Sequence, residues 1–527
     1  MRQKGGRVLL IGLDAADAEL IERWAAAGEL ETFARLMREG SWSRLRTTAE
    51  VLHVSAWPTI YTGATPGRHG LYHAYQVRAG DQRIHRADPR WMALPPFWKT
   101  LDEAGRRCIV FDAFMDAPTE GFGGVQIGEW GTWTWFGDPF SKPAGLRDRL
   151  VREIGPYPAP EHSQQVTIPD QRWFRDRLVA GAAAKARAVD WLLREQPWDM
   201  AFVTFGEPHG GGHYLWHSQD PDYPIHRPIA GLPHPLLDVY AAVDRAIGDI
   251  LARHLDDRTT VLVVSGDGMG PNFSGAHLVP ELLHAMDLYH APGVGKPRHD
   301  TAAAAPKPSL TKRLREAIPM PVRMAMSRCL PRSIKYRLSL KWLNADIDWA
   351  RTKAFPIHNN NEGFIRLNLA GREPRGIVEP GAAYEELLGR LERELDALRN
   401  PENGRKAGRV YAIDTVFPGS ERPHLPDLVI SWDESARVLD RLDGPSCGVV
   451  RGKCGYETPA HYSGNHRPNA FLLAAGASVA AGSAIEGGHI LDVPATMLAL
   501  LGVDPPAYYE GRERSGALAK VSLTDLV

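Results

Sequence analysis

The sequence predicts an α/β fold in which a mostly parallel central sheet is flanked by helices. Short apolar runs that end in a polar or glycine-containing turn alternate with segments of helical periodicity, which is typical of parallel strands joined by crossover helices. Six runs are predicted to be strands of this sheet: 7–14, 108–112, 200–205, 260–265, 427–432 and 470–474. An amphipathic helical stretch over 18–38 is predicted to follow the first strand.

Composition excludes several classes of protein. With 527 residues, 43% of them hydrophobic, the chain is long enough to bury a sizeable core. A net charge of −1 disfavours a nucleic-acid partner, because such proteins present basic surfaces to phosphates. Four scattered cysteines and a short N-terminal apolar run, with no stretch near 20 apolar residues, predict a cytoplasmic protein without a membrane partner. A small-molecule substrate is expected, and a homo-oligomer is compatible with these data.

Changes in composition and sequence pattern along the chain predict three parts. Residues 1–294 are predicted to form the first part of the core, 295–425 an inserted α+β cap or lid, and 426–527 the second part of the core. Within the insertion, residues 295–345 are basic and interrupted by prolines. A solvated pair of amphipathic helices is favoured there over a lid or a surface for an acidic partner.

Polar residues gather just after the predicted strands. In open α/β sheets, ligands bind at the carboxyl ends of the strands, so these side chains are expected to meet. Carboxylates and imidazoles drawn from several strand ends are the donors that zinc, manganese or iron prefers. A single aspartate after a strand more often caps a helix, so the inference depends on the group. Its members are Asp14, Glu207, His209, His213, Asp267 and His466.

His209 and His213 have the i, i+4 spacing that places two imidazoles on one face of a helix. Gly210, Gly211 and Gly212 lie between them. Three consecutive glycines favour a tight loop over a regular helix, so we expect the histidines to converge through loop geometry.

The sequence resembles the alkaline phosphatase superfamily, and within it the type I phosphodiesterase/nucleotide pyrophosphatase branch. Five segments carry the resemblance in the family's order: the first strand ending in Asp14, SAWPTIYTGATPGRHGLYH, GHYLWH, SGDGMG and SGNHRPNAFLLAAG. The TG-x-x-P-x-x-HG signature from Thr62 to Gly70 is the most specific of the matches. The resemblance implies one α/β core with an inserted cap, two metal ions that hold a phosphate ester, and a Thr or Ser nucleophile.

Some of the family's functional positions are kept and others are changed. Asp14 matches its first metal-binding aspartate, and His213 and His466 match the two histidines of one metal site. His53 occupies the position of the nucleophile. His209 replaces an aspartate. In the segment where the family has Ser-Asp-His-Gly, Gly266 and Asp267 replace the aspartate and the histidine.

Three explanations of the altered nucleophile position are open. A metal-bound hydroxide could attack the phosphorus directly, because a bound divalent metal lowers the pKa of water to about 7. Ser55 could supply the hydroxyl, although a turn or cap role is the commoner one for such a serine. His53 could be a metal ligand; we favour this together with the hydroxide. One or two ions, zinc rather than manganese or iron, would then be bound by Asp14, His53, His209, His213, Asp267 and His466.

Other residues are weaker candidates. Tyr72 and His73 follow the family signature and are expected to line the substrate pocket, and Asn272 to hydrogen-bond a substrate oxygen. The run from Asn359 to Glu362 resembles a cap segment of the family and is expected to form a turn.

The sequence thus predicts a metal-dependent hydrolase that cleaves a phosphate ester or phosphodiester of a small molecule. One alternative is a relative with a histidine-rich metal site that acts on a sulfate, a phosphonate or another metal-chelating molecule. Another is a catalytically silent protein that binds an anion. Because Asp14, His213 and His466 are kept, the silent alternative is the weakest.

Overall fold

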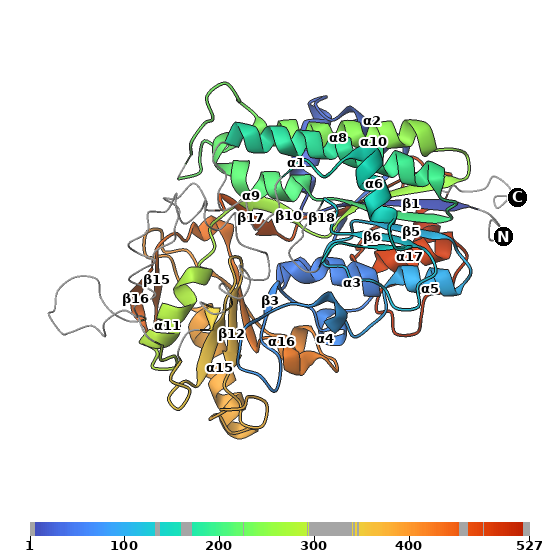
Figure 1. The fold of residues 1–527 in the computed structure, drawn as a ribbon. Helices are drawn as coiled ribbons and strands as arrows, with labels where there is room; N and C mark the ends of the chain where they lie inside the picture. The colour runs from blue at the N-terminus through green and yellow to red at the C-terminus, as the bar shows by residue number, and fades with distance from the viewer. Residues whose placement is uncertain are drawn as a thin grey trace, which may run out of the picture.

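The computed structural model describes residues 6–131, 138–159, 171–224, 226–291, 347–452, 462–477 and 479–519, and also 294, 340, 343 and 344. The helix pair or lid expected over 295–345 lies outside the described residues except for three of them. Two lobes are visible, one built on a large sheet and the other on a smaller sheet (Figure 1).

The central sheet has eight strands and is mostly parallel, as predicted. Its order is β2 (Ser41–Leu45), β18 (Ala470–Gly476), β9 (Thr259–Ser265), β1 (Arg7–Leu13), β8 (Met200–Phe205), β5 (Cys108–Phe111), β6 (Val125–Gly128) and β7 (Phe140–Lys142). The strands from β9 to β6 are parallel, while β18 and β7 run antiparallel to their neighbours. The carboxyl ends of β1, β8 and β9 therefore meet at one edge.

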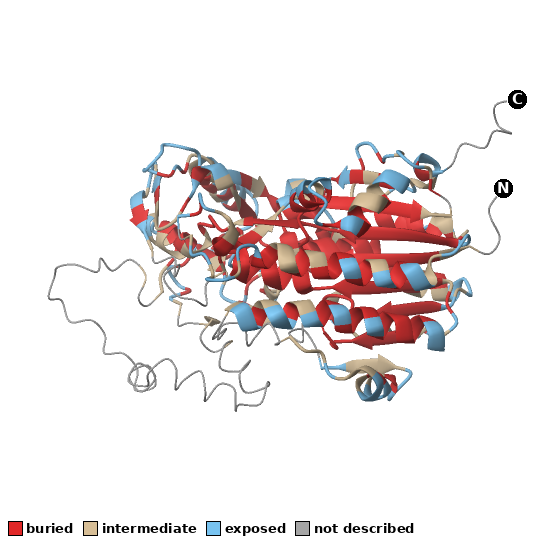
Figure 2. Cartoon of the chain, turned by 90° about the horizontal axis from the view of Figure 1, so that it is seen from above, coloured by how far each residue is buried: buried red, intermediate tan, exposed pale blue. Residues whose placement is uncertain are grey.

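Each face of this sheet is covered by helices, because side chains of a strand alternate between the two faces. In β1, Leu9 and Ile11 pack into one core cluster, and Val8 and Leu10 into another on the opposite face. The strands are consequently buried (Figure 2). The first cluster contains residues of α1 (Ala18–Ala26), α2 (Glu31–Glu39), α6 (Leu146–Ile154), α8 (Gln171–Glu195) and α10 (Pro235–His254); the second contains α3 (Ala56–Thr62), α5 (Phe97–Glu103) and α17 (Asp492–Leu500).

The structure refines one sequence prediction about these elements and contradicts another. The stretch 18–38 is helical as expected and forms two helices, α1 and α2, because the chain turns between them at Gly28, which has a φ of +81° that disfavours other residues. The run 427–432 forms a strand, β14 (Leu428–Trp432), but this strand belongs to the smaller sheet. An apolar run indicates that a strand is buried, but it does not indicate which sheet the strand joins.

The smaller lobe is an antiparallel sheet in the order β11 (Ala354–Ile357), β12 (Gly363–Leu367), β14 and β13 (Gly408–Ala412). It shares a core cluster with α15 (Ala382–Asp396), α11 (Val279–Ala285) and the hairpin β15 (Arg441–Gly444) and β16 (Gly448–Arg451). The lobe thus uses residues before 295 and after 425. The division at these residues stays a prediction.

A two-stranded ribbon, β10 (Gly268–Pro271) with β17 (Gly464–Arg467), follows the carboxyl end of β9 and lies against helix α9 (Glu207–Gln219). Within the described ranges, no helix combines the length and the apolar character needed to cross a membrane.

We expect the smaller lobe to depend on one buried carboxylate. Asp427 accepts hydrogen bonds from Arg372 and Arg422, and the charge of Arg372 keeps its pKa below the usual value although burial opposes this. Asp427→Ala would leave the buried arginines with one carboxylate fewer, since only Glu373 would remain beside Arg372 and only Asp414 beside Arg422. It should lower the free energy of unfolding by about 3–5 kcal/mol, measured by urea denaturation. The matched control is Asp396→Ala, which removes an exposed pair with Lys406 and should cost at most about 1 kcal/mol. Equal losses would contradict the argument.

Candidate metal centre and active site

Helix α9 carries two of the expected metal ligands, and it corrects one prediction. Residues 207–219 form a continuous helix through all three glycines, so the loop expected there was wrong. Each glycine costs a helix about 1 kcal/mol relative to alanine. Packing explains why they are present: a Cβ on Gly211 would lie 2.9 Å from Leu236, and one on Gly212 would lie 2.6 Å from Met269 of β10. The close approach to the ribbon thus requires Gly212, and the close approach to α10 requires Gly211.

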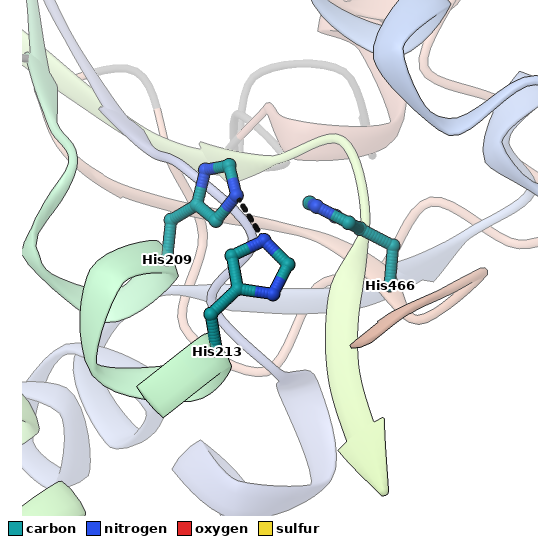
Figure 3. A group of neighbouring side chains, drawn as sticks. All are labelled: His209, His213 and His466. Atoms are coloured by element: carbon teal, nitrogen blue, oxygen red, sulfur yellow. Dashed lines mark hydrogen bonds between the residues drawn. The ribbon is translucent and has the colours of Figure 1, made fainter. Parts of the chain in front are cut away.

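Three imidazoles meet between α9 and the ribbon. His209 and His213, one turn apart on α9, direct their Nε2 atoms at each other at 2.8 Å, and His466 of β17 faces them (Figure 3). One ligand atom from each of the three rings lies within 4.8 Å of the other two. All three side chains are at least nine-tenths buried. Among the described residues, this is the one group of histidine, cysteine and acidic side chains close enough to bind an ion.

Nδ1 of each of the three histidines donates a hydrogen bond to a neighbouring group of the protein. His209 Nδ1 donates to Asp14 Oδ2 at 2.6 Å, His466 Nδ1 donates to Asp267 Oδ2 at 2.6 Å, and His213 Nδ1 donates to the carbonyl oxygen of Gly464 at 2.9 Å. Such outer partners orient ligating histidines in metal sites. Asp14 and Asp267, expected as metal ligands, therefore hydrogen-bond two of the three imidazoles, and both also line the cavity that the imidazoles line.

This donor set fits a divalent cation. With Nδ1–H donated outward, a neutral imidazole keeps its lone pair on Nε2, so the 2.8 Å contact between Nε2 of His209 and Nε2 of His213 needs an extra proton on one ring. A cation bound by both nitrogens would take the place of that proton. The surrounding charge is also suitable: burial, and next the negative charges of Asp14 and Glu362, raise the pKa of Asp267 well above its usual value. A positive ion would offset this accumulated negative charge.

His53 stands beside this cluster and is held by a residue of the smaller lobe. It lies in a short 3-10 turn, His53–Ser55, ahead of α3. Its ring stacks on His466 with centroids 4.2 Å apart. Nδ1 of His53 is 2.7 and 2.9 Å from the two carboxylate oxygens of Glu362, and its backbone N–H donates to Oε1 at 2.9 Å. His53 thus faces a carboxylate and is not one of the three clustered imidazoles.

Glu362 is a buried negative charge. Burial alone would raise its pKa, but the charge that His53 carries when protonated and hydrogen bonds from His53 and Asn359 lower the pKa to about 2. Asn359 Nδ2 donates to Oε2 at 2.7 Å, and Asn359 Oδ1 accepts from the backbone of Asn361 at 2.9 Å. The last contact closes an Asx turn, as expected for the run from Asn359 to Glu362.

The three histidines and His53 line one cleft, whose empty space measures about 790 Å³ counted to its open mouth. One wall is aromatic and another is made of amides. No lysine, arginine, serine, threonine or cysteine is among the described residues that line it. The aromatic residues are Trp57, Tyr75, Phe114 and Tyr462, and the amides are Asn359, Asn360, Asn361 and Asn465.

Comparison with known proteins identifies the family of this chain. The sequence model of the family described as type I phosphodiesterase/nucleotide pyrophosphatase matches residues 8–457. The chain belongs to this family. The resemblance to this family that the sequence motifs indicated is thus confirmed, and the members of the family are hydrolases.

Solved structures and curated sequences add less. Murine ectonucleotide pyrophosphatase/phosphodiesterase 5, as an inactive variant in complex with AMP, is 13% identical with a TM-score of 0.48, covering 95% of this chain and 96% of its own. The human protein is 12% identical with a TM-score of 0.49, covering 98% and 100%. No curated protein sequence is significantly similar to this chain.

Other residues singled out from the family pattern lie in different places. His73 lines the cleft, and burial lowers its pKa to about 3, so it is neutral at physiological pH. Ser55 and Tyr72 are fully buried and are not among the residues that line the cleft; the Ser55 hydroxyl donates to the carbonyl of Leu52. Asn272 lies behind the wall, where its Nδ2 donates to the carbonyl of Tyr462.

Sequence reasoning missed the role of Glu362 and the contact of Trp57 with Asp14, where the indole N–H donates to Oδ1 at 2.7 Å. Trp57 lies in the segment SAWPTIYTGATPGRHGLYH that resembles the family, four residues after His53, so its position was a usable signal. Glu362 is 309 residues from His53, and no spacing rule could have joined them.

The cluster predicts where metal affinity resides. His213→Ala removes a donor atom, so it should weaken zinc binding by more than roughly 100-fold. Loss of a residue that only hydrogen-bonds a metal ligand costs up to about that factor. The measurement is competition of purified protein with a chelating indicator, supported by metal analysis. His358→Ala is the matched control, because His358 lines the same cleft outside the cluster. Equal affinity in the two variants would contradict the assignment.

Proposed function

We propose that this protein is a metal-dependent phosphodiesterase that hydrolyses a nucleotide-like small molecule. The observation that carries the proposal is the three-histidine cluster, buried at the base of a cleft at the carboxyl edge of the sheet in a chain of the type I phosphodiesterase family. One ion is proposed. Zinc suits three imidazole nitrogens best, and manganese and iron are the alternatives.

In this proposal His209, His213 and His466 hold the ion, and Asp14 and Asp267 orient two of these rings. A divalent cation at this place would neutralise phosphoryl oxygens and lower the pKa of water, which are the two contributions that phosphoester hydrolysis requires. The protein itself excludes bulk water by burying the three rings, and it fixes their tautomers through Asp14, Asp267 and the Gly464 carbonyl.

The charges around the cleft favour a diester over a monoester. A monoester carries up to two negative charges at neutral pH and a diester carries one. Asp14, Asp267 and Glu362 are close by, and no lysine or arginine is among the described residues that line the cleft. The second negative charge of a monoester would therefore meet repulsion without a compensating cation from the protein.

The aromatic wall gives the second substituent of a diester a place to bind. Tyr462 stacks on His213 with ring centroids 4.0 Å apart, so the aromatic surface continues directly from the metal cluster. Trp57, Tyr75 and Phe114 line the same cleft. Rings of this kind suit a flat, partly apolar group such as a nucleobase.

The proposal is tested with two chromogenic esters. The zinc-loaded protein should hydrolyse bis-p-nitrophenyl phosphate with a kcat/KM at least about tenfold above that for p-nitrophenyl phosphate, a difference of about 1.4 kcal/mol in transition-state stabilisation. Removal of the metal by a chelator should abolish the activity, and zinc should restore it.

Two results would overturn the proposal. A metal-loaded protein that cleaves neither ester would not be a phosphodiesterase. A p-nitrophenyl sulfatase or phosphonatase activity that exceeds both rates would assign the cleft to a different substrate.

A further inference from the structure

We infer that Glu362 and His53 form a catalytic dyad, in which Nε2 of His53 accepts the proton of the attacking water and Glu362 positions the ring. The inference rests on the proposed function. It assigns His53 a role as a proton acceptor where metal ligation was expected, and it gives the smaller lobe a direct part in the chemistry.

The contacts of Glu362 are those of a positioning residue. Its carboxylate receives both the backbone N–H of His53, at 2.9 Å, and the ring Nδ1, at 2.7 Å, so it fixes the turn and the imidazole together. Asn359 Nδ2 holds the other carboxylate oxygen at 2.7 Å. His53 and Glu362 are 8% and 3% exposed, so water competes little for these bonds. The imidazole therefore has one defined orientation.

This orientation determines which nitrogen can take a proton. A neutral imidazole has one N–H and one lone pair. When Nδ1–H is donated to Glu362, the lone pair is on Nε2, which is the ring nitrogen left to the cleft that His53 lines. The negative carboxylate then stabilises the positive charge that appears on the ring as Nε2 gains a proton.

His53 is also in the right place. Its ring stacks on that of His466, 4.2 Å between centroids, so His53 lies next to the three-histidine cluster at which a phosphoryl group would be held. The described lining offers no serine, threonine, cysteine or lysine to act instead. His73, the neighbouring ring, has its Nδ1 3.1 Å from the backbone nitrogen of Tyr75, and no carboxylate of the described residues forms a hydrogen bond with it.

The step conserves atoms and charge. A lone pair of the water oxygen forms the new P–O bond while one water proton moves to His53 Nε2. The P–O bond to the leaving group breaks, its electron pair stays on the leaving oxygen, and that oxygen takes up a proton from solvent. His53 then releases its proton to solvent. The net reaction is diester plus water giving monoester plus alcohol, with inversion at phosphorus.

The test compares His53→Ala and Glu362→Gln with the wild type, all loaded with zinc and assayed on bis-p-nitrophenyl phosphate. His53→Ala should lose about 10²–10⁴-fold in kcat, the usual contribution of a general base, and should keep its metal and its KM. Imidazole added to the solution should restore part of the kcat of His53→Ala. Glu362→Gln should lose roughly 10–100-fold in kcat with KM unchanged, as expected for a residue that orients another.

The matched control is His254→Ala. His254 also pairs with a carboxylate, Asp190, at 3.0 Å, but this pair lies on α10 and α8, away from the cleft. Its removal should leave kcat unchanged, and imidazole should have no effect on it. The control separates loss of a histidine–carboxylate pair in general from loss of the dyad.

Several results would overturn the inference and leave the proposed function intact. Loss of zinc from His53→Ala would make His53 a metal ligand. Retained metal without rescue by imidazole would make its role structural. Retention of configuration at phosphorus, read with a single phosphorothioate isomer in ¹⁸O-water, would make His53 a covalent nucleophile. A wild-type protein inactive on every phosphodiester would instead remove the proposed function, and the dyad with it.

Discussion

The close approach of α9 to the β10–β17 ribbon is the constraint on which the site depends. A Cβ on Gly464 would lie 2.2 Å from the carbonyl oxygen of Gly212, so neither backbone could come so near if residue 464 carried a side chain. The backbone N–H of Ser463 donates to the carbonyl of His213 at 2.7 Å across the same contact. This approach places His213 and His466 within reach of one ion. The helix accepts poor intrinsic propensity because tertiary packing compensates for it.

The carboxylates around the cleft form hydrogen bonds with imidazole rings. Asp14 and Asp267 hold imidazoles of the cluster, and Glu362 holds His53 next to it. A carboxylate bonded to an imidazole serves two purposes in the proposed chemistry. In the metal cluster it fixes which ring nitrogen faces the ion, and at His53 it fixes which ring nitrogen faces the substrate. The negative charge of the three groups also attracts a cation and repels a substrate with two negative charges.

The smaller lobe takes part in the site through one loop. The segment just before β12 supplies Glu362, and its neighbours Asn359 and Asn361 line the cleft. Behind the loop, β12 is paired with β14, and the Arg372–Asp427 pair joins the backbone of this sheet to a buried charge network. The stability of the lobe and the position of His53 are thus linked, since Glu362 can hold the ring only if its strand is in register.

From the sequence alone, the parallel sheet, the strand ends and the family could be predicted, because burial patterns and short motifs are local properties. His209, His213 and His466 were found this way, and the structure brings them together. Tertiary structure decided what local patterns do not contain: that three glycines belong to a helix, that β14 belongs to the smaller sheet, and that Asp14 and Asp267 hydrogen-bond imidazoles. It also joined Glu362 to His53 across 309 residues, because such a contact depends on how the two lobes meet.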